Sequence, residues 1–171
     1  MKNLAYLIGI LFLITTSCFN KEASKVEEIS YTLDTNMVII KDSLLLRYLE
    51  RSGLEYFELT NKEVYQVNKI LEKAIEDEKF SFLKEPRLAS LNKYYRQYYG
   101  YINDKNERIV RVNAFCQLLP TPVRVNGEFV WRIFDWKHNF LMMDDGGACY
   151  WGGKINLKSN LWFDLRVNGL A

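Results

Sequence analysis

Short runs of aromatic and β-branched residues recur through the second half of the chain, and they constrain its fold more than any other feature. Residues 94–115, YYRQYYGYINDKNERIVRVNAF, contain two such runs around the turn residues NDKNE, which predicts a β-hairpin. The further runs are FVWRIFDW, FLMM, ACYWGGKINL and LWFDLRV, separated by KHN, DDGG and KSN. Strands at such short intervals predict an antiparallel β-meander.

The last of these runs also alternates in polarity along the chain. One set of alternating positions is apolar, and it comprises Leu161, Phe163, Leu165 and Val167. The set between them comprises Trp162, Asp164, Arg166 and Asn168. Because side chains of a strand point to opposite faces in turn, this pattern predicts a strand with one buried and one solvated face.

An amphipathic helix is predicted upstream of the strands, in ELTNKEVYQVNKILEKAIEDE, residues 58–78. Thr60 followed by Glu63 has the spacing of a capping box, which marks the start of a helix. Apolar residues then recur at helical spacing, at Val64, Val67, Leu71, Ala74 and Ile75. A stripe of this width is typical of a helix face that packs into a core.

These patterns together predict one α+β domain over residues 31–171. In this prediction a single helix packs on a curled antiparallel meander, the general architecture of cystatin-like and NTF2-like folds, and this is an analogy of architecture alone. The chain of 171 residues has three prolines and is 49% hydrophobic, which fits one globular domain. Its formal charge of +2 is too small for a nucleic-acid-binding surface.

The N-terminus has the layout of a secretory signal. Lys2 supplies a positive charge, residues 4–14 are apolar or small without any charge, and residues 15–17 are small and polar. The apolar run of roughly 11 residues is shorter than the ~20 that a spanning helix needs. The sequence therefore predicts export without a permanent transmembrane anchor.

The residues before Cys18 resemble the lipobox of bacterial lipoproteins, in which a cysteine thiol receives a diacylglyceryl group before the signal is cut. The resemblance implies a signal peptide at 1–17, a lipidated Cys18 and a polar tether over 18–30. Phe19 stands where an Asp would imply retention at the inner membrane, so the resemblance implies an outer-membrane lipoprotein of the cell envelope. An ordinary signal peptide cut nearby and an uncut anchor are the alternatives.

The C-terminal stretch DDGGACYWGGKINLKSNLWFDLRVNGLA, taken with residues 94–116, resembles small uncharacterised lipoproteins of Gram-negative bacteria. The shared features are a D-G-G turn, an aromatic strand and a closing V-N-G. The resemblance covers about the last 80 residues. It implies a compartment and a fold, and no activity comes with it.

Two cysteines, Cys116 and Cys149, remain once Cys18 is lipidated. Cys116 ends one predicted strand and Cys149 begins another, so antiparallel pairing of those strands would bring the two residues to the same edge. An oxidising envelope permits a disulfide there. The sequence therefore predicts that the two cysteines are close together, and it leaves open whether they form a disulfide or stay as two free buried thiols.

The most specific function that the sequence suggests is ligand binding through aromatic residues. We expect at least two of four aromatic side chains to lie exposed on one side of the sheet, where they could bind a glycan, a peptide or an envelope protein. The four are Tyr95, Tyr99, Trp151 and Trp162. The competing interpretation is that they fill the core against the helix. A binding or interaction module without a cofactor is favoured over an enzyme.

Catalytic and metal-binding patterns are weak throughout. The DDGG segment, residues 144–147, is interpreted as turn chemistry, because it lacks the spaced oxygen ligands of a calcium loop. His138 is the one histidine, and a set with Asp135 and Cys149 has no motif around it.

The alternative to a binding module is an extracytoplasmic hydrolase built from scattered carboxylates. Its candidates are Asp135, Asp144 and Asp145. Convergence of these side chains in one concave pocket would favour the enzyme. A surface of exposed aromatic side chains would favour the binder.

Overall fold

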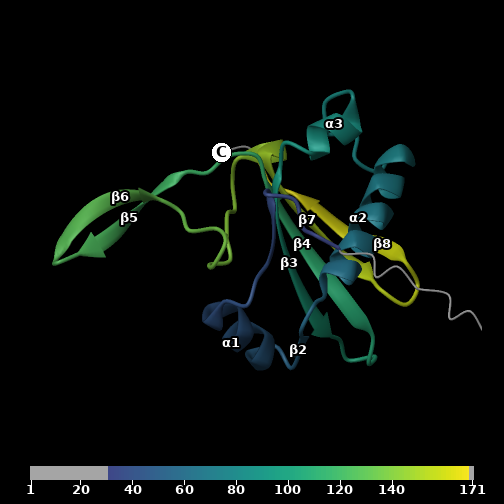
Figure 1. The fold of residues 1–171 in the computed structure, drawn as a ribbon, viewed down its shortest axis with the longest axis horizontal. Helices are drawn as coiled ribbons and strands as arrows, with labels where there is room; N and C mark the ends of the chain where they lie inside the picture. Colours follow the sequence, from purple (N-terminus) through teal and green to yellow (C-terminus); the bar gives the residue numbers. More distant parts are fainter. Residues whose placement is uncertain (1–30, 170–171) are drawn as a thin grey trace, which may run out of the picture. The chain divides into compact units, whose positions relative to one another are not determined.

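A six-stranded sheet forms the centre of the structure, a computed structural model that describes residues 31–169 (Figure 1). The strands are β1 (Met37–Ile39), β3 (Tyr95–Ile102), β4 (Arg108–Phe115), β7 (Tyr150–Asn156) and β8 (Leu161–Val167) in spatial order, with β2 (Glu55–Phe57) also paired to β3. Pairing is antiparallel except between β1 and β3. The predicted signal peptide, Cys18 and the predicted tether lie outside the described residues.

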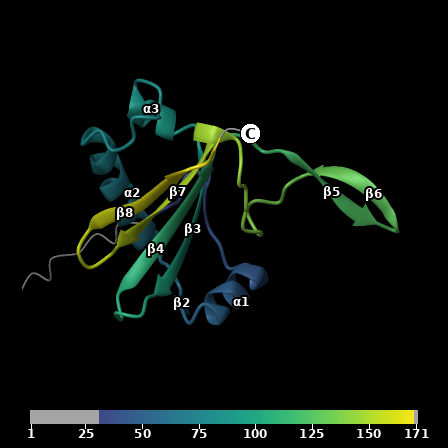
Figure 2. The same ribbon diagram turned by 180° about the vertical axis from the view of Figure 1, so that it is seen from behind.

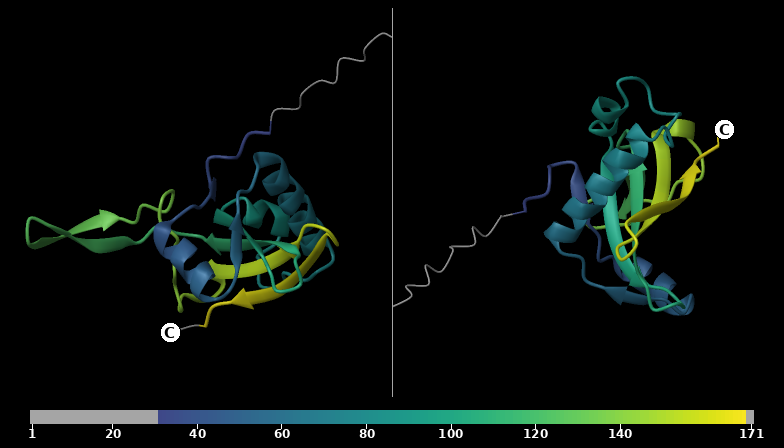
Figure 3. Two further views of the ribbon diagram at one scale, coloured as in Figure 1. Left: turned by 90° about the horizontal axis from the view of Figure 1, so that it is seen from below. Right: turned by 90° about the vertical axis from the view of Figure 1, so that its right-hand side faces the viewer.

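Three helices accompany the sheet, where the sequence predicted one: α1 (Ser43–Arg51), α2 (Asn61–Glu76) and α3 (Arg87–Leu91). The mixed α+β class is confirmed, and the sheet is not closed into a barrel. Helices α1 and α2 cover opposite faces of the sheet (Figures 2 and 3). Within the described residues, no helix is both long and apolar enough to cross a membrane.

Helix α2 begins as the sequence predicts. The Thr60 side chain accepts a hydrogen bond from the backbone N–H of Glu63, and the Glu63 carboxylate accepts one from the backbone N–H of Thr60. The capping box is therefore confirmed. The predicted apolar stripe is buried against the sheet, which confirms its assignment to the core.

Helix α1 forms from a segment whose local pattern favours no single structure. The side chain of Asp42 caps it by accepting a hydrogen bond from the N–H of Leu44. Leu45 and Leu49 of α1 are buried with Tyr99 and other side chains of the sheet face opposite to α2. This second layer covers a sheet face on which exposed aromatic side chains were expected.

The chain leaves the predicted meander between β4 and β7. Strands β5 (Pro120–Val125) and β6 (Glu128–Ile133) pair only with each other, across a turn at Asn126 and Gly127 with φ angles of 52° and 93°. Asn-Gly at a two-residue turn is the strongest short hairpin signal, and it could have predicted this ribbon. Strand β4 pairs directly with β7 instead.

The prediction of a strand at FLMM, residues 140–143, is wrong. Its backbone bonds to side chains rather than to a neighbouring strand. The N–H of Phe140 donates to Asp42, and the N–H of Leu141 donates to Gln97. The Leu141 carbonyl accepts from the side chain of Asn113. These side-chain partners replace a strand ladder, so the segment crosses the sheet face as a loop.

The predicted two-faced pattern of the last strand is also wrong. Leu161 and Phe163 are exposed, whereas Trp162 is half-buried in the core beneath α2. The register between β7 and β8 shifts within this strand, because two residues, Asp164 and Leu165, lie opposite the single Gly153 of β7. The irregularity interrupts the alternation, because it changes which residues point to each face.

Candidate functional site

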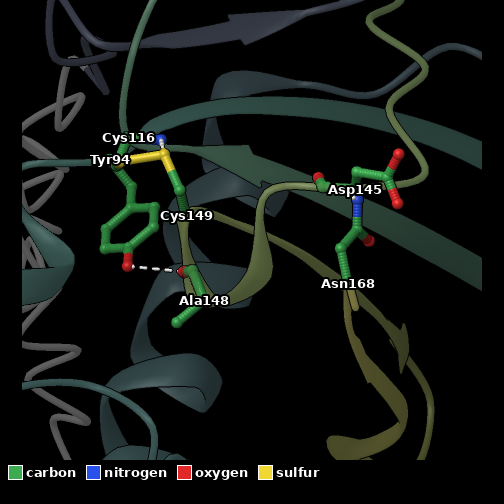
Figure 4. The surroundings of a disulfide bond; sticks show 6 residues. All are labelled: Tyr94, Cys116, Asp145, Ala148, Cys149 and Asn168. Carbon is green, nitrogen blue, oxygen red and sulfur yellow. Dashed lines mark hydrogen bonds between the residues drawn. A yellow bond between two sulfur atoms is a disulfide. The ribbon is translucent and has the colours of Figure 1, made fainter. Parts of the chain in front are cut away.

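A disulfide joins Cys116, just after β4, to Cys149, just before β7 (Figure 4). Their Cα atoms are 4.9 Å apart, as expected for residues at the same edge of two antiparallel neighbours. Beside the bridge, the Tyr94 hydroxyl donates a hydrogen bond of 2.8 Å to the Ala148 carbonyl. The sulfur of Cys149 is therefore part of the scaffold and is not a nucleophile.

The expected exposed aromatic face is not present. Tyr99 and Trp151 are buried, and Tyr95 and Trp162 are half-buried. The two tyrosines belong to the clusters on the α1 side of the sheet, and the two tryptophans belong to the cluster beneath α2. The prediction is wrong because both faces of the sheet are covered, and the competing core interpretation describes these residues.

The structure instead forms a pocket of about 430 Å³ between α1, the loop at 140–142 and the sheet. This volume falls in the range of small-molecule sites. Three exposed apolar side chains form its rim, namely Leu44, Tyr48 and Met142. Its polar lining includes Arg111 of β4, Lys154 of β7, Arg166 of β8 and Asp42.

The three cations of the pocket surround one carboxylate, Asp164. Its oxygens lie 2.8 Å from the Lys154 ammonium, 3.1 Å from the Arg166 guanidinium and 3.9 Å from the Arg111 guanidinium. The hydrogen bond from Lys154 is the main reason that the Asp164 pKa is lowered, and Arg166 adds to it. Asp42 lines the pocket, and Asp164 lies beside it in contact with the three cations, so three positive charges face two negative ones.

Arg111, Lys154 and Arg166 form the cationic floor of the pocket, and two tyrosine hydroxyls border it. Burial raises the pKa of Tyr99 to about 12, although the nearby Arg111 opposes the shift. Burial likewise raises the pKa of Tyr101, with Lys154 opposing it. Both side chains stay protonated at neutral pH and can donate hydrogen bonds. The pocket thus combines hydrogen-bond donors and positive charge with an apolar rim.

The carboxylates of the hydrolase hypothesis do not line this pocket. Asp135, Asp144 and Asp145 are all exposed, and Asp135 is 2.9 Å from Nδ1 of the exposed His138. Among the described residues, no group of three or more histidine, cysteine or acidic side chains is placed to hold a metal ion. Cys149 is in the disulfide, so the His-Cys-Asp set cannot act.

Sequence patterns did not predict the three cations of the pocket, Arg111, Lys154 and Arg166. Arg111 and Lys154 occupy strands whose other inward positions are mostly apolar or aromatic, and the register places them opposite each other on the same face. Ile109 shares this face with Arg111 and is buried. A charge at an inward strand position was the available signal, because buried charge is costly and needs partners.

Comparisons with known proteins give no assignment for this chain. No family model, curated protein or solved structure matches it. A function must accordingly be inferred from the site itself, from the chemistry and geometry of its residues.

Proposed function

We propose that the domain is a binding module that holds a small amphipathic anion in the pocket between α1 and the sheet. The observation that carries the proposal is the convergence of Arg111, Lys154 and Arg166 beneath a rim of exposed apolar side chains. An acyl or aryl group would bury that rim, and a carboxylate or phosphate would bind the cations.

A neutral glycan stacked on the sheet is disfavoured, because stacking on a sugar needs an accessible ring face and the sheet aromatics Tyr95, Tyr99, Trp151 and Trp162 are buried or half-buried. A peptide end that carries a carboxylate next to an apolar side chain belongs to the same chemical class as an acyl anion. In this proposal the protein is a lipid-anchored component of the cell envelope, at the outer membrane, and does not bind nucleic acid. We also propose a cystatin-like or NTF2-like architecture for the domain, as an analogy of architecture alone.

Octyl phosphate and octanoate are suitable probes for the pocket, with octyltrimethylammonium as the cation of equal chain length. Lys154→Gln should weaken binding of both anions about tenfold or more, because a hydrogen bond to a charged group is lost. Lys62→Gln, an exposed change in the first turn of α2, should leave affinity unchanged. Calorimetric titration gives the affinities, and backbone amide NMR shifts locate the site.

Equal binding of the octyl cation would show that the pocket is merely apolar and would contradict the proposal. So would amide shifts confined to residues outside the pocket. A loss of affinity in Lys62→Gln as large as that in Lys154→Gln would mean that total charge, and not the pocket, controls binding.

The anchor is tested separately from the pocket. Cys18→Ser should abolish incorporation of labelled fatty acid and leave an uncut precursor, because serine offers no thiol for the diacylglyceryl group. Ser17→Ala keeps a small residue before the cut and should be lipidated like the wild type. Incorporation of label into the Cys18→Ser variant at the wild-type level would refute the lipobox interpretation.

A further inference from the structure

The β5–β6 ribbon exposes large apolar side chains on one face. Phe129, Trp131 and Ile133 are 72%, 68% and 59% exposed, and alternation places all three on the same side. No residue of either strand belongs to the buried clusters of the described chain. A two-stranded hairpin is marginally stable alone, whereas three or more strands with an apolar face can be stable.

The two edges of the ribbon differ in what they can accept. The N–H of Phe134 donates to the Leu119 carbonyl, so these two residues form a hydrogen-bonded pair. Every second residue pair along the ribbon from there is likewise hydrogen-bonded between β5 and β6. Pro120 and Pro122 fall at the positions between, whose N–H groups would point outward, and proline has none. The outer edge of β5 is therefore closed to a further strand.

The outer edge of β6 is open. Phe129, Trp131 and Ile133 are the partners of the outward positions of β5, so their own N–H and C=O groups point away from the ribbon. Every residue of β6 is exposed. This edge presents a row of backbone groups that can accept one more antiparallel strand.

We propose that the added strand is β6 of a second copy of this chain. The sequence EFVWR, residues 128–132, is complementary to itself when two copies run antiparallel with Val130 opposite Val130. Phe129 then lies opposite Trp131 of the second copy, and Glu128 lies opposite Arg132 of the second copy. The twofold axis repeats each pair, giving two aromatic pairs and two ion pairs.

Charge selects this register over its neighbours. A shift that places Trp131 opposite itself sets Arg132 opposite Val130 and leaves Glu128 without a cation across the strands. In the proposed register, the pairs of Phe129 with Trp131 exchange backbone hydrogen bonds through the open edge. The product is a four-stranded sheet, and the apolar faces of both ribbons become continuous.

Cysteine cross-linking of the full-length chain tests this arrangement. Val130→Cys should form a disulfide-linked dimer in air, because the cysteine faces its own copy at the twofold axis. Val123→Cys is the matched control on β5, at 40% exposure against 41% for Val130. Its copies would be three strand spacings apart, about 14 Å, and should not cross-link. The wild-type chain controls for dimers formed through Cys18.

Charge reversal in the Val130→Cys background provides the second test. Glu128→Arg or Arg132→Glu alone should lower the cross-linked yield about tenfold, since each places like charges opposite each other twice. The double reversal should restore the yield. Neither position lines the anion pocket, so ligand affinity should stay constant.

Three results would overturn the proposal. Equal yields from Val123→Cys and Val130→Cys would indicate random collision. Single and double reversals with the same yield would refute the register. A chain that shows no cross-link but binds phosphatidylglycerol vesicles, with a fluorescence change that Trp131→Phe abolishes, would make a lipid surface the occupant of the ribbon.

Discussion

Replacing Trp151 by alanine should lower the free energy of unfolding by about 3–5 kcal/mol. The Trp151 side chain is 2% exposed and packs from β7 against the segment after α2. Its ring centroid lies 5.3 Å from that of Phe80 and 6.2 Å from that of Trp162. Removing the indole leaves a cavity among aromatic rings that the sheet cannot close. Chemical denaturation followed by far-UV circular dichroism measures the loss.

Trp131→Ala is the matched control for this experiment. It removes the same type of side chain from an exposed position on β6. The free energy of unfolding of the dilute chain should therefore change by less than about 0.5 kcal/mol. Equal destabilisation by the two variants would mean that the ribbon is packed in solution. A change below 1 kcal/mol for Trp151→Ala would contradict the core described here.

Replacing both Cys116 and Cys149 by serine should lower the free energy of unfolding by about 3–4 kcal/mol in the chain-entropy model. The residues are 33 positions apart, and the unbridged unfolded chain gains the freedom of that loop. The loop includes the β5–β6 ribbon and the segment at 140–142 that forms one wall of the pocket. Loss of the bridge should therefore weaken anion binding as well as stability.

A reducing agent supplies the control for the cysteine variant. Reduction of the wild-type chain should shift its denaturation midpoint to that of the double serine variant, and reduction of the variant should have no effect. A wild-type midpoint that does not respond to reductant, with two thiols titrating in the denatured chain, would show that Cys116 and Cys149 are not bridged.

The sequence by itself determined the elements whose partners are close in the chain. Helix α2 follows from the capping box of Thr60 and Glu63 and from its apolar period, which act within single helical turns. The hairpin of β3 and β4 follows from two strand patterns around a short loop. The adjacency of Cys116 and Cys149, which are 33 positions apart, was predicted only on the assumption that β4 and β7 are antiparallel neighbours, and the tertiary structure decided that pairing.

Only the tertiary structure decided which faces are covered and which strands are joined. A period of two residues identifies a strand, but it does not name the partner, so β6 and β7 look alike in sequence although they enter different sheets. The covering of Tyr99 depends on α1, whose local pattern was ambiguous. The pocket arises where Arg111, Lys154 and Arg166 from three strands meet beneath that helix, through contacts between residues far apart in the chain. Such contacts depend on the packing of whole elements against one another, which no local pattern contains.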